Sequence, residues 1–281
     1  MMRNGWFWLS LGVGGPVGLY LLCLVGLYVF QNLLLFAPPD FSVSGLREEA
    51  IARKLRQVPL TASDGTALMS LHHPSEGPRS VLYFHGNAGS VLDDLELKTR
   101  LQQEGWDVLS VGYRGYPGSS GAPSEQGMRL DALASYYYAV DDLNIPPEHV
   151  VFHGRSMGGG VVGTIMNEVP VGGLVFESTF TAAVDRAAEL YPFFPVRWLM
   201  KSPFNTKRQA AGIDKPVWIV HSDADEVIPV AHGRALNEAF SNVQYREVSG
   251  VTHNQGILDE PKMWTEYLNF INSVARREID D

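Results

Sequence analysis

Short apolar runs alternate with segments of helical periodicity along most of the chain. Runs typical of buried strands occupy residues 81–84, 106–111, 150–152, 173–176, 216–220 and 243–248. Apolar positions spaced three and four apart predict helices over 91–103, 125–141, 157–167 and 261–274. An Asp-Gly pair at 64–65, between apolar runs at 58–61 and 67–71, predicts an initial β-hairpin. This alternation predicts an α/β fold with a mostly parallel central sheet flanked by helices.

The first part of the chain is apolar without interruption. Residues 4–39 contain no Asp, Glu, Lys or Arg, and this run exceeds the ~20 residues that a helix needs to cross a bilayer. Trp6 and Trp8 near one end and Tyr28 near the other suit the two membrane interfaces. The run is also too long for the apolar core of a signal peptide. A single-pass membrane protein with a retained transmembrane anchor at 1–37 is therefore predicted.

Basic residues on the two sides of the anchor leave its orientation open. Arg3 and the α-amine slightly favour a cytoplasmic N-terminus, whereas the basic residues between 47 and 56 favour the opposite. The side of the membrane that carries the folded domain is not predicted.

The remaining residues suffice for one large α/β domain and are too few for two. We expect a linker at 38–56 and the α/β domain at 57–281. Within it, 179–214 forms an insertion between two strands, with aromatic residues at 191–200. This insertion is either a helix with an aromatic packing face or a small lid, and both descriptions can hold together.

Composition narrows the possible partners and chemistry. The formal net charge is −9 and no basic stripe occurs, which excludes nucleic acid as an expected partner. Cys23 is the only cysteine and lies in the apolar stretch, so an intrachain disulfide is impossible. No motif for a cofactor is present, and the acidic run 223–226 is too short for a calcium loop. We therefore expect neither a cofactor nor a metal.

One motif in the chain predicts covalent catalysis. Residues 154–158 read Gly-Arg-Ser-Met-Gly, directly after the strand at 150–152 and before the helix at 157–167. A nucleophilic serine needs such a sharp turn, because small residues on both sides let its hydroxyl stand exposed beside backbone N–H groups. A phosphate-binding turn is disfavoured because no Lys follows the glycines. Ser156 is the predicted nucleophile.

With Ser156 in this setting, the chain resembles an α/β-hydrolase-fold serine hydrolase, in particular the membrane-anchored abhydrolase-domain proteins with a small lid. The resemblance covers about residues 55–278. It rests on the Ser motif and on five further segments, at 84–89, 113–121, 123–125, 177–180 and 221–229.

A serine hydroxyl needs a histidine to take its proton and a carboxylate to orient that histidine. In this fold the acid and then the histidine follow the serine in the chain. His253, after the final strand, is the predicted base, whereas His221 and His232 are expected to be structural. The family pattern implies Asp225 as the acid, with Asp223 as the alternative.

The oxyanion that forms on attack needs two backbone donors. One is expected to be the N–H of Met157, the residue after the nucleophile. By resemblance, the other is the N–H of Asn87, in the loop after the strand at 81–84. Arg114 is expected to hold a loop through an acid such as Glu125 or Glu177, rather than to bind substrate.

These observations predict a membrane-anchored serine hydrolase that cleaves carboxylic esters or thioesters. The apolar anchor and the segment 191–200 suggest lipid-like acyl substrates or acylated proteins, although a fold does not fix a substrate. Two alternatives stay open. One is a peptidase of the prolyl-oligopeptidase type, whose large additional domain has no counterpart here, and the other is a non-catalytic binding protein on the same fold.

Overall fold

The computed structural model describes residues 4–40 and 42–275, and its centre is one eight-stranded sheet. The strand order is β1-β2-β4-β3-β5-β6-β7-β8. β1 is antiparallel to β2, β2 is antiparallel to β4, and all other neighbours are parallel. The predicted hairpin and the mostly parallel sheet are confirmed. The strands are β1 Arg56–Thr61, β2 Ala67–His73, β3 Ser80–Phe84, β4 Asp107–Ser110, β5 Val150–Arg155, β6 Gly173–Glu177, β7 Val217–Ser222 and β8 Val243–Val248.

The central strands are buried on both faces. In β3, Leu82 and Phe84 pack into one apolar cluster, whereas Val81 and Tyr83 pack into another. Successive side chains of a strand point to opposite faces, so the two clusters lie on opposite sides of the sheet. This double burial explains why these strands read as continuous apolar runs instead of alternating ones.

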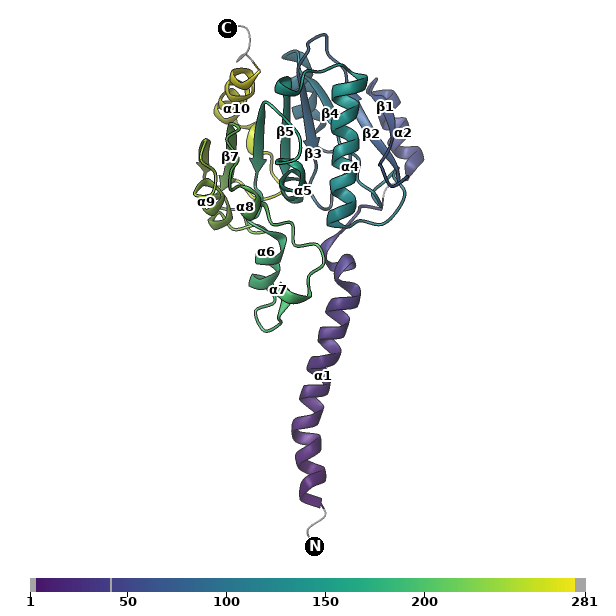
Figure 1. Cartoon of the computed structure of the whole chain (residues 1–281), viewed down its shortest axis with the longest axis vertical. Helices are drawn as coiled ribbons and strands as arrows, with labels where there is room; N and C mark the ends of the chain where they lie inside the picture. The colour runs from purple at the N-terminus through teal and green to yellow at the C-terminus, as the bar shows by residue number, and fades with distance from the viewer. Residues whose placement is uncertain (1–3, 41, 276–281) are drawn as a thin grey trace.

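Helices cover both faces of the sheet (Figure 1). Met128 of α4 and Val161 of α5 join the cluster of Leu82, while Leu101 of α3 and Tyr267 of α10 join the other cluster. The bounds are α3 Leu95–Gln103, α4 Glu125–Tyr137 with a π-helical continuation Tyr138–Asp142, α5 Met157–Ile165, α9 Ala231–Asn237 and α10 Pro261–Val274, with short 3-10 turns at Pro147–His149 and Ile257–Asp259. The helix expected from residue 91 begins only at residue 95.

Helix α1, Asn4–Leu35, extends away from the domain (Figure 1). It continues through Pro16. Its segment Gly15–Leu35 has a mean hydropathy of 1.9, is long and apolar enough to cross a membrane, and is not buried against the protein. Arg3 lies outside the described residues, and the side chains of Trp6 and Trp8 are not described either.

The segment expected to be a linker, 38–56, contains a packed helix. Helix α2, Val43–Ala52, begins where the Ser42 hydroxyl accepts a hydrogen bond from the N–H of Gly45. Leu46 and Ala50 are fully buried and form a small cluster with residues of the domain. Much of this connection is therefore folded against the sheet.

The insertion after β6 contains three short helices, α6 Ala183–Leu190, α7 Val196–Leu199 and α8 Thr206–Gln209. Helix α8 lies against the domain, whereas α6 and α7 project below it beside the end of α1 (Figure 1). Residues 182–201 are called the α6–α7 arm below.

Candidate active site

Ser156 occupies a sharp turn between β5 and α5. Its φ of 54° and ψ of −120° are unusual for a residue with a side chain. Two hydrogen bonds hold this conformation: the Ser156 N–H donates to the carbonyl of Glu177 at 2.9 Å, and the Thr179 hydroxyl donates to the Ser156 carbonyl at 2.7 Å. The serine side chain therefore stands at the carboxyl end of the sheet, beside the amino end of a helix.

The glycines of the turn are required by close backbone approach. A Cβ on Gly158 would lie 2.0 Å from the carbonyl oxygen of Phe84, and one on Gly154 would lie 2.6 Å from the Cα of Gly159. Neither distance is compatible with a side chain, since the neighbouring atoms belong to the backbone. The small residues at these two positions thus let helix α5 pack directly on β3 and β5.

The structure brings Ser156, His253 and Asp225 into one hydrogen-bonded row. Ser156 Oγ lies 2.9 Å from His253 Nε2, and His253 Nδ1 lies 2.7 Å from Asp225 Oδ2. Asp225 follows β7 and His253 follows β8, so both loops leave the sheet at the edge where the turn at Ser156 lies. In this arrangement the imidazole can take a proton from the hydroxyl while the carboxylate fixes the ring.

The Asp225 carboxylate is buried and held on both oxygens. Oδ1 accepts hydrogen bonds from the N–H groups of Val227 at 3.0 Å and Ile228 at 2.7 Å. Burial favours the neutral acid, but hydrogen bonds from His221, His253 and the Ile228 N–H outweigh it and hold the pKa of Asp225 well below its usual range. Asp225 is therefore a fixed negative charge beside His253.

The other late candidates make no contact with Ser156 or the His253 ring, although His221 Nε2 lies 3.4 Å from Asp225 Oδ2. Asp223, the alternative acid, accepts from the Ser249 hydroxyl at 2.8 Å and the Gly250 N–H at 3.0 Å. His221 Nε2 lies 2.7 Å from the Ile228 carbonyl oxygen, which requires this nitrogen to carry the proton. The structure thus gives Asp223 and His221 contacts that shape the two loops.

His232 lies at the base of the α6–α7 arm. Its Nδ1 is 2.9 Å from the Thr181 hydroxyl, and its Nε2 is 3.2 Å from a carboxylate oxygen of Glu189 in α6. The histidine therefore ties the arm to α9 and does not reach the hydroxyl of Ser156.

Asn87 lies in the loop after β3, next to the serine. A Cβ on the adjacent Gly86 would lie 3.5 Å from Ser156 Cβ. The Asn87 side chain donates to the Leu35 carbonyl at 2.7 Å and accepts from the Ala37 N–H at 3.0 Å and the Tyr116 hydroxyl at 3.0 Å. The amide thus holds the loop against the end of α1 and Tyr116, and the backbone N–H is the group that would serve an oxyanion.

Met157 supplies the first N–H of α5. The first N–H groups of a helix have no partner within the helix, and they carry the positive end of its dipole. This N–H directly follows Ser156. It is therefore placed to donate a hydrogen bond to the oxyanion of a tetrahedral intermediate bonded to the serine.

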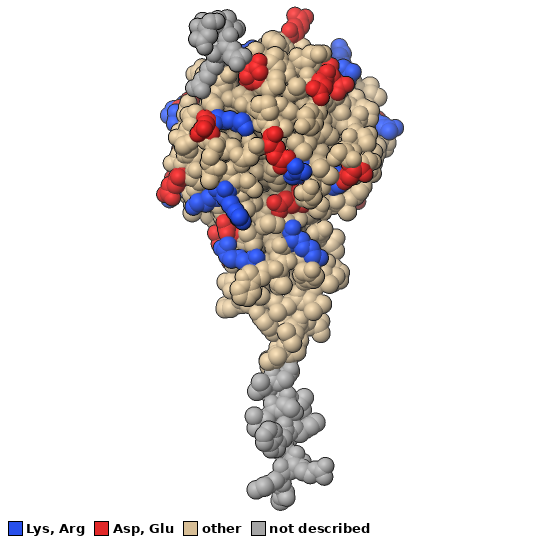
Figure 2. All heavy atoms as spheres, in the orientation of Figure 1, with Lys and Arg blue, Asp and Glu red and all other residues tan. Residues whose placement is uncertain are grey.

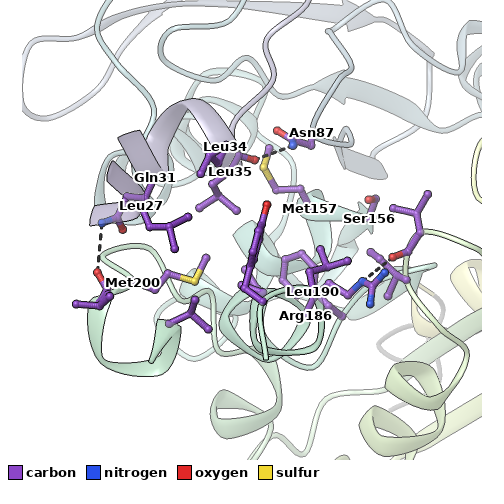
Figure 3. A pocket seen from close by; sticks show the side chains of 18 residues that line it. Leu27, Gln31, Leu34, Leu35, Asn87, Ser156, Met157, Arg186, Leu190 and Met200 are labelled. Carbon is purple, nitrogen blue, oxygen red and sulfur yellow. Dashed lines mark hydrogen bonds between the residues drawn. The ribbon is translucent and has the colours of Figure 1, made fainter. Parts of the chain in front are cut away.

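A cavity of about 440 Å³ opens at Ser156 (Figure 3). Ligand sites in proteins commonly have volumes of about 300–1,000 Å³. Its walls are mainly apolar side chains from the α6–α7 arm and from the end of α1, and Asn87 and Met157 line it beside the serine. The site therefore combines a hydrogen-bonded serine with a predominantly apolar cavity.

Known proteins with similar sequences show the family of this chain. The alpha/beta hydrolase fold family model matches residues 79–209. An alpha/beta hydrolase domain-containing protein of Arabidopsis thaliana, WAV2, is 31% identical over 277 residues, which cover 89% of this chain and 90% of the relative. An uncharacterised protein of Mycobacterium tuberculosis is 30% identical over 226 residues, and this alignment covers 78% of this chain and 80% of the relative. The chain belongs to the α/β-hydrolase family.

Two further comparisons concern enzymes. The lysophosphatidylserine lipase ABHD12 of Macaca fascicularis is 32% identical over 176 residues, which cover 56% of this chain and 44% of the lipase. The Pyrococcus furiosus esterase Pf2001 superposes with a TM-score of 0.68 at 18% identity, covering 86% of this chain and 98% of the esterase. The latter likeness concerns the fold alone.

In this α/β hydrolase, Arg155 holds the loop of the candidate base, a role that the sequence did not reveal. Its guanidinium pairs with Asp94 at 2.8 Å and approaches Glu177 at 3.8 Å. It also donates to the His253 carbonyl at 3.2 Å. The only signal in the sequence was its position between Gly154 and Ser156, which the motif leaves unspecified.

We expect Arg155→Met to lower kcat on an ester substrate by about tenfold or more, because the loop of His253 loses its anchor. The carboxylates of Asp94 and Glu177 also lose their cationic partner, which costs about 3 kcal/mol in unfolding free energy. Steady-state kinetics and urea unfolding measure the two effects. Arg234→Met removes an exposed ion pair with Glu247 and is the matched control. Unchanged kcat in Arg155→Met would show that the loop holds His253 without this residue.

The expected partners of Arg114 were wrong. Its guanidinium bonds to Asp131 at 2.8 Å and to Asp64 at 2.7 Å, whereas Glu125 accepts from the Phe204 N–H and Glu177 contacts His153. Asp131 lies six residues after Glu125 at the start of α4, and Asp64 lies in the β1–β2 hairpin. Arg114 therefore holds loops together, through acids that the sequence pattern did not identify.

Proposed function

We propose that this α/β hydrolase is a membrane-anchored serine hydrolase that cleaves carboxylic ester or thioester bonds through an acyl-enzyme on Ser156. The observation that carries the proposal is the row Ser156–His253–Asp225, with separations of 2.9 and 2.7 Å, at the end of an apolar cavity. Neither a serine hydroxyl nor an imidazole has this reactivity alone, and their pairing with a buried carboxylate provides it.

In the first half of the reaction, Ser156 Oγ attacks the carbonyl carbon of the acyl group while its proton passes to His253 Nε2. The carbonyl oxygen becomes negative and is stabilised by the N–H groups of Met157 and Asn87. The bond between carbon and the leaving oxygen or sulfur then breaks, and the imidazolium returns the proton to the leaving group. An alcohol or thiol departs, and the acyl group remains on Ser156.

The second half repeats these steps with water. His253 takes a proton from the water, whose oxygen attacks the acyl carbon, and the same two N–H groups stabilise the oxyanion. The bond to Ser156 Oγ breaks, and the imidazolium returns its proton to the serine. A carboxylic acid leaves and the enzyme is restored. Asp225 stays negative throughout and stabilises the imidazolium each time it forms.

Three observations support an acyl substrate and a membrane location. The cavity beside Ser156 is mainly apolar, α1 has the length and composition of a membrane span, and a relative is a lysophosphatidylserine lipase. On this basis α1 is the retained anchor of residues 1–37, and a lipid-like acyl compound or an acylated protein is the substrate.

A fluorophosphonate probe tests the proposal on the full-length protein in detergent. We expect the probe to label Ser156, identified by mass spectrometry of the labelled peptide, because the reagent reacts with activated serines. We further expect hydrolysis of p-nitrophenyl butyrate and none of an Ala-Pro p-nitroanilide. Absence of labelling would favour a non-catalytic binding protein on this fold, and cleavage of the anilide in place of the ester would favour a peptidase.

A further inference from the structure

The apolar cavity is closed on one side by the candidate membrane helix itself (Figure 3). Leu27, Gln31, Leu34 and Leu35 of α1 line it opposite residues of the α6–α7 arm. Their spacing of four, three and one residues places all four on one face of the helix. Leu33 is 77% exposed and does not line the cavity. The helix thus presents one defined face to the site.

The cavity runs along α1 from Ser156 toward the membrane. Leu35 marks its catalytic end, since the Leu35 carbonyl accepts from the side chain of Asn87. Leu27 marks the far end, eight residues and about 12 Å earlier along the helix axis. Both residues belong to the apolar segment Gly15–Leu35. Along the helix axis, the cavity therefore lies beside the part of α1 that would enter the bilayer.

The side chains beside the cavity favour a position near the membrane surface. The helix has 32 residues, more than the ~20 that cross the hydrocarbon layer, so not all of it lies in that layer. Tyr28 and Lys201, which are adjacent in the chain to the cavity residues Leu27 and Met200, meet with the ammonium 4.1 Å from the ring centre. Aromatic and basic side chains are the groups that favour the headgroup region. On the face shown in Figure 2, charged side chains reach the upper part of the arm, and the narrow lower part of the described molecule shows none.

Polar contacts fasten the α6–α7 arm to α1. The Gln31 side chain donates to the Leu199 carbonyl at 3.2 Å and accepts from the Lys201 N–H at 2.6 Å. The Tyr20 hydroxyl donates to the Phe193 carbonyl at 3.0 Å. Tyr20 precedes Leu35 by fifteen residues, about 22 Å along the helix. The tip of the arm therefore lies beside the membrane segment and not above it.

The tip of the arm, which lies beside the apolar segment of α1, exposes large apolar side chains. Phe193 is 85% and Trp198 is 89% exposed. Such a patch on a soluble surface is unfavourable, and an apolar layer around α1 would cover it. The acyl chains of a bilayer would therefore contact both the exposed tip of the arm and the membrane segment beside it.

We propose that α1 forms the acyl-chain wall of the substrate site, so that the enzyme acts on long-chain esters of bilayer lipids and Leu27 limits the chain length. The proposal rests on the function proposed above. The ester carbonyl lies at Ser156, and the acyl chain extends along α1 between Leu34 and the arm toward Leu27. A domain without α1 would lack this wall and the contacts that hold Asn87.

Two opposite substitutions at Leu27 test the chain-length claim in the full-length protein. The readout is the ratio of kcat/KM for p-nitrophenyl laurate to that for p-nitrophenyl butyrate. Leu27→Trp fills the far end of the cavity and is expected to lower this ratio by about tenfold or more, since each unaccommodated methylene costs about tenfold. Leu27→Ala enlarges the same end and is expected to move the preferred chain length upward.

Leu33→Trp and Leu33→Ala are the matched controls, because Leu33 lies on the same helix outside the cavity. They are expected to leave the ratio unchanged. Equal ratios in wild type and both Leu27 variants would overturn the proposal. Fluorophosphonate labelling of each variant separates this outcome from failure of the proposed function, in which wild type itself would neither label nor hydrolyse butyrate.

Wild-type protein in phosphatidylcholine vesicles tests whether the substrate comes from the bilayer or from solution. A long-chain monoacylglycerol embedded in these vesicles is expected to be hydrolysed, because its acyl chain already lies beside α1. Failure to hydrolyse it, while decanoyl-coenzyme A in solution and p-nitrophenyl butyrate are cleaved, would assign the site to soluble acyl compounds and overturn the bilayer assignment.

Discussion

Ser156→Ala and His253→Ala are each expected to lower kcat for p-nitrophenyl butyrate by about 10⁵–10⁶-fold. Alanine at position 156 leaves no oxygen to accept the acyl group, and alanine at position 253 leaves no base at 2.9 Å to take the hydroxyl proton. Because the two groups act as one unit, the double variant is expected to be no slower than either single variant. The measurement is steady-state hydrolysis by full-length protein, accompanied by urea unfolding.

Ser44→Ala is the control for this series, since Ser44 is exposed on α2. It is expected to match wild type. Losses that multiply in the double variant would indicate that Ser156 and His253 act independently, and a fully active Ser156→Ala would remove the acyl-enzyme altogether. The unfolding midpoints separate these outcomes from a loss of fold.

The parts of the site that could be predicted are those with a local physical signature. The turn at Ser156 is encoded within a few residues, by a buried strand, by glycines where a Cβ would meet backbone atoms, and by a helix. The order of the acid and the base then follows from the parallel sheet, in which successive strands end at the same edge. The roles of these residues stay a prediction until they are tested.

Contacts between distant segments left no such signature. Gln31 meets backbone groups of Leu199 and Lys201, about 170 residues away, and a glutamine side chain suits any carbonyl. Similarly, the sequence contains many acidic residues that could pair with Arg114. Only the folded structure shows that its partners are Asp131 and Asp64. Side-chain pairing of this kind depends on the tertiary structure. Hydrophobic periodicity and secondary-structure propensity describe local segments and do not specify it.

The helix α2 was missed for a different reason. It is short, with charged residues at the three central positions 47–49, and its packing depends chiefly on Leu46 and Ala50. Two buried positions four residues apart are too few to distinguish a helix from a charged linker. The capping Ser42 was a signal of the helix start that the apolar pattern did not highlight.

Asp225→Asn is expected to lower kcat by about 10⁴-fold while leaving the fold intact. In the structure Oδ1 accepts from two backbone N–H groups, those of Val227 and Ile228, and Oδ2 faces His253 Nδ1. An amide keeps its oxygen toward the two N–H groups, so its NH₂ group must face Nδ1. The imidazole then carries its proton on Nε2 and cannot accept the proton of Ser156.

The same substitution is expected to change how stability depends on pH. Because the pKa of Asp225 lies below its usual range in the folded protein, the unfolded chain takes up the proton first as the pH falls. The contribution of Asp225 to the free energy of unfolding is therefore fully present above about pH 4 and is lost toward lower pH. Urea unfolding of wild type and Asp225→Asn should give a difference that shrinks below that pH.

Asp223→Asn is the matched control, since Asp223 lies two residues away and is the other acid that the sequence allows for this role. Its carboxylate bonds to Ser249 and Gly250 in the loop that precedes His253, so its neutralisation is expected to lower kcat by less than about tenfold. A 10⁴-fold loss in Asp223→Asn together with a mild effect in Asp225→Asn would reverse the assignment of the acid. Equal, mild effects in both variants would mean that His253 is oriented without a carboxylate, which would contradict the mechanism proposed for Ser156.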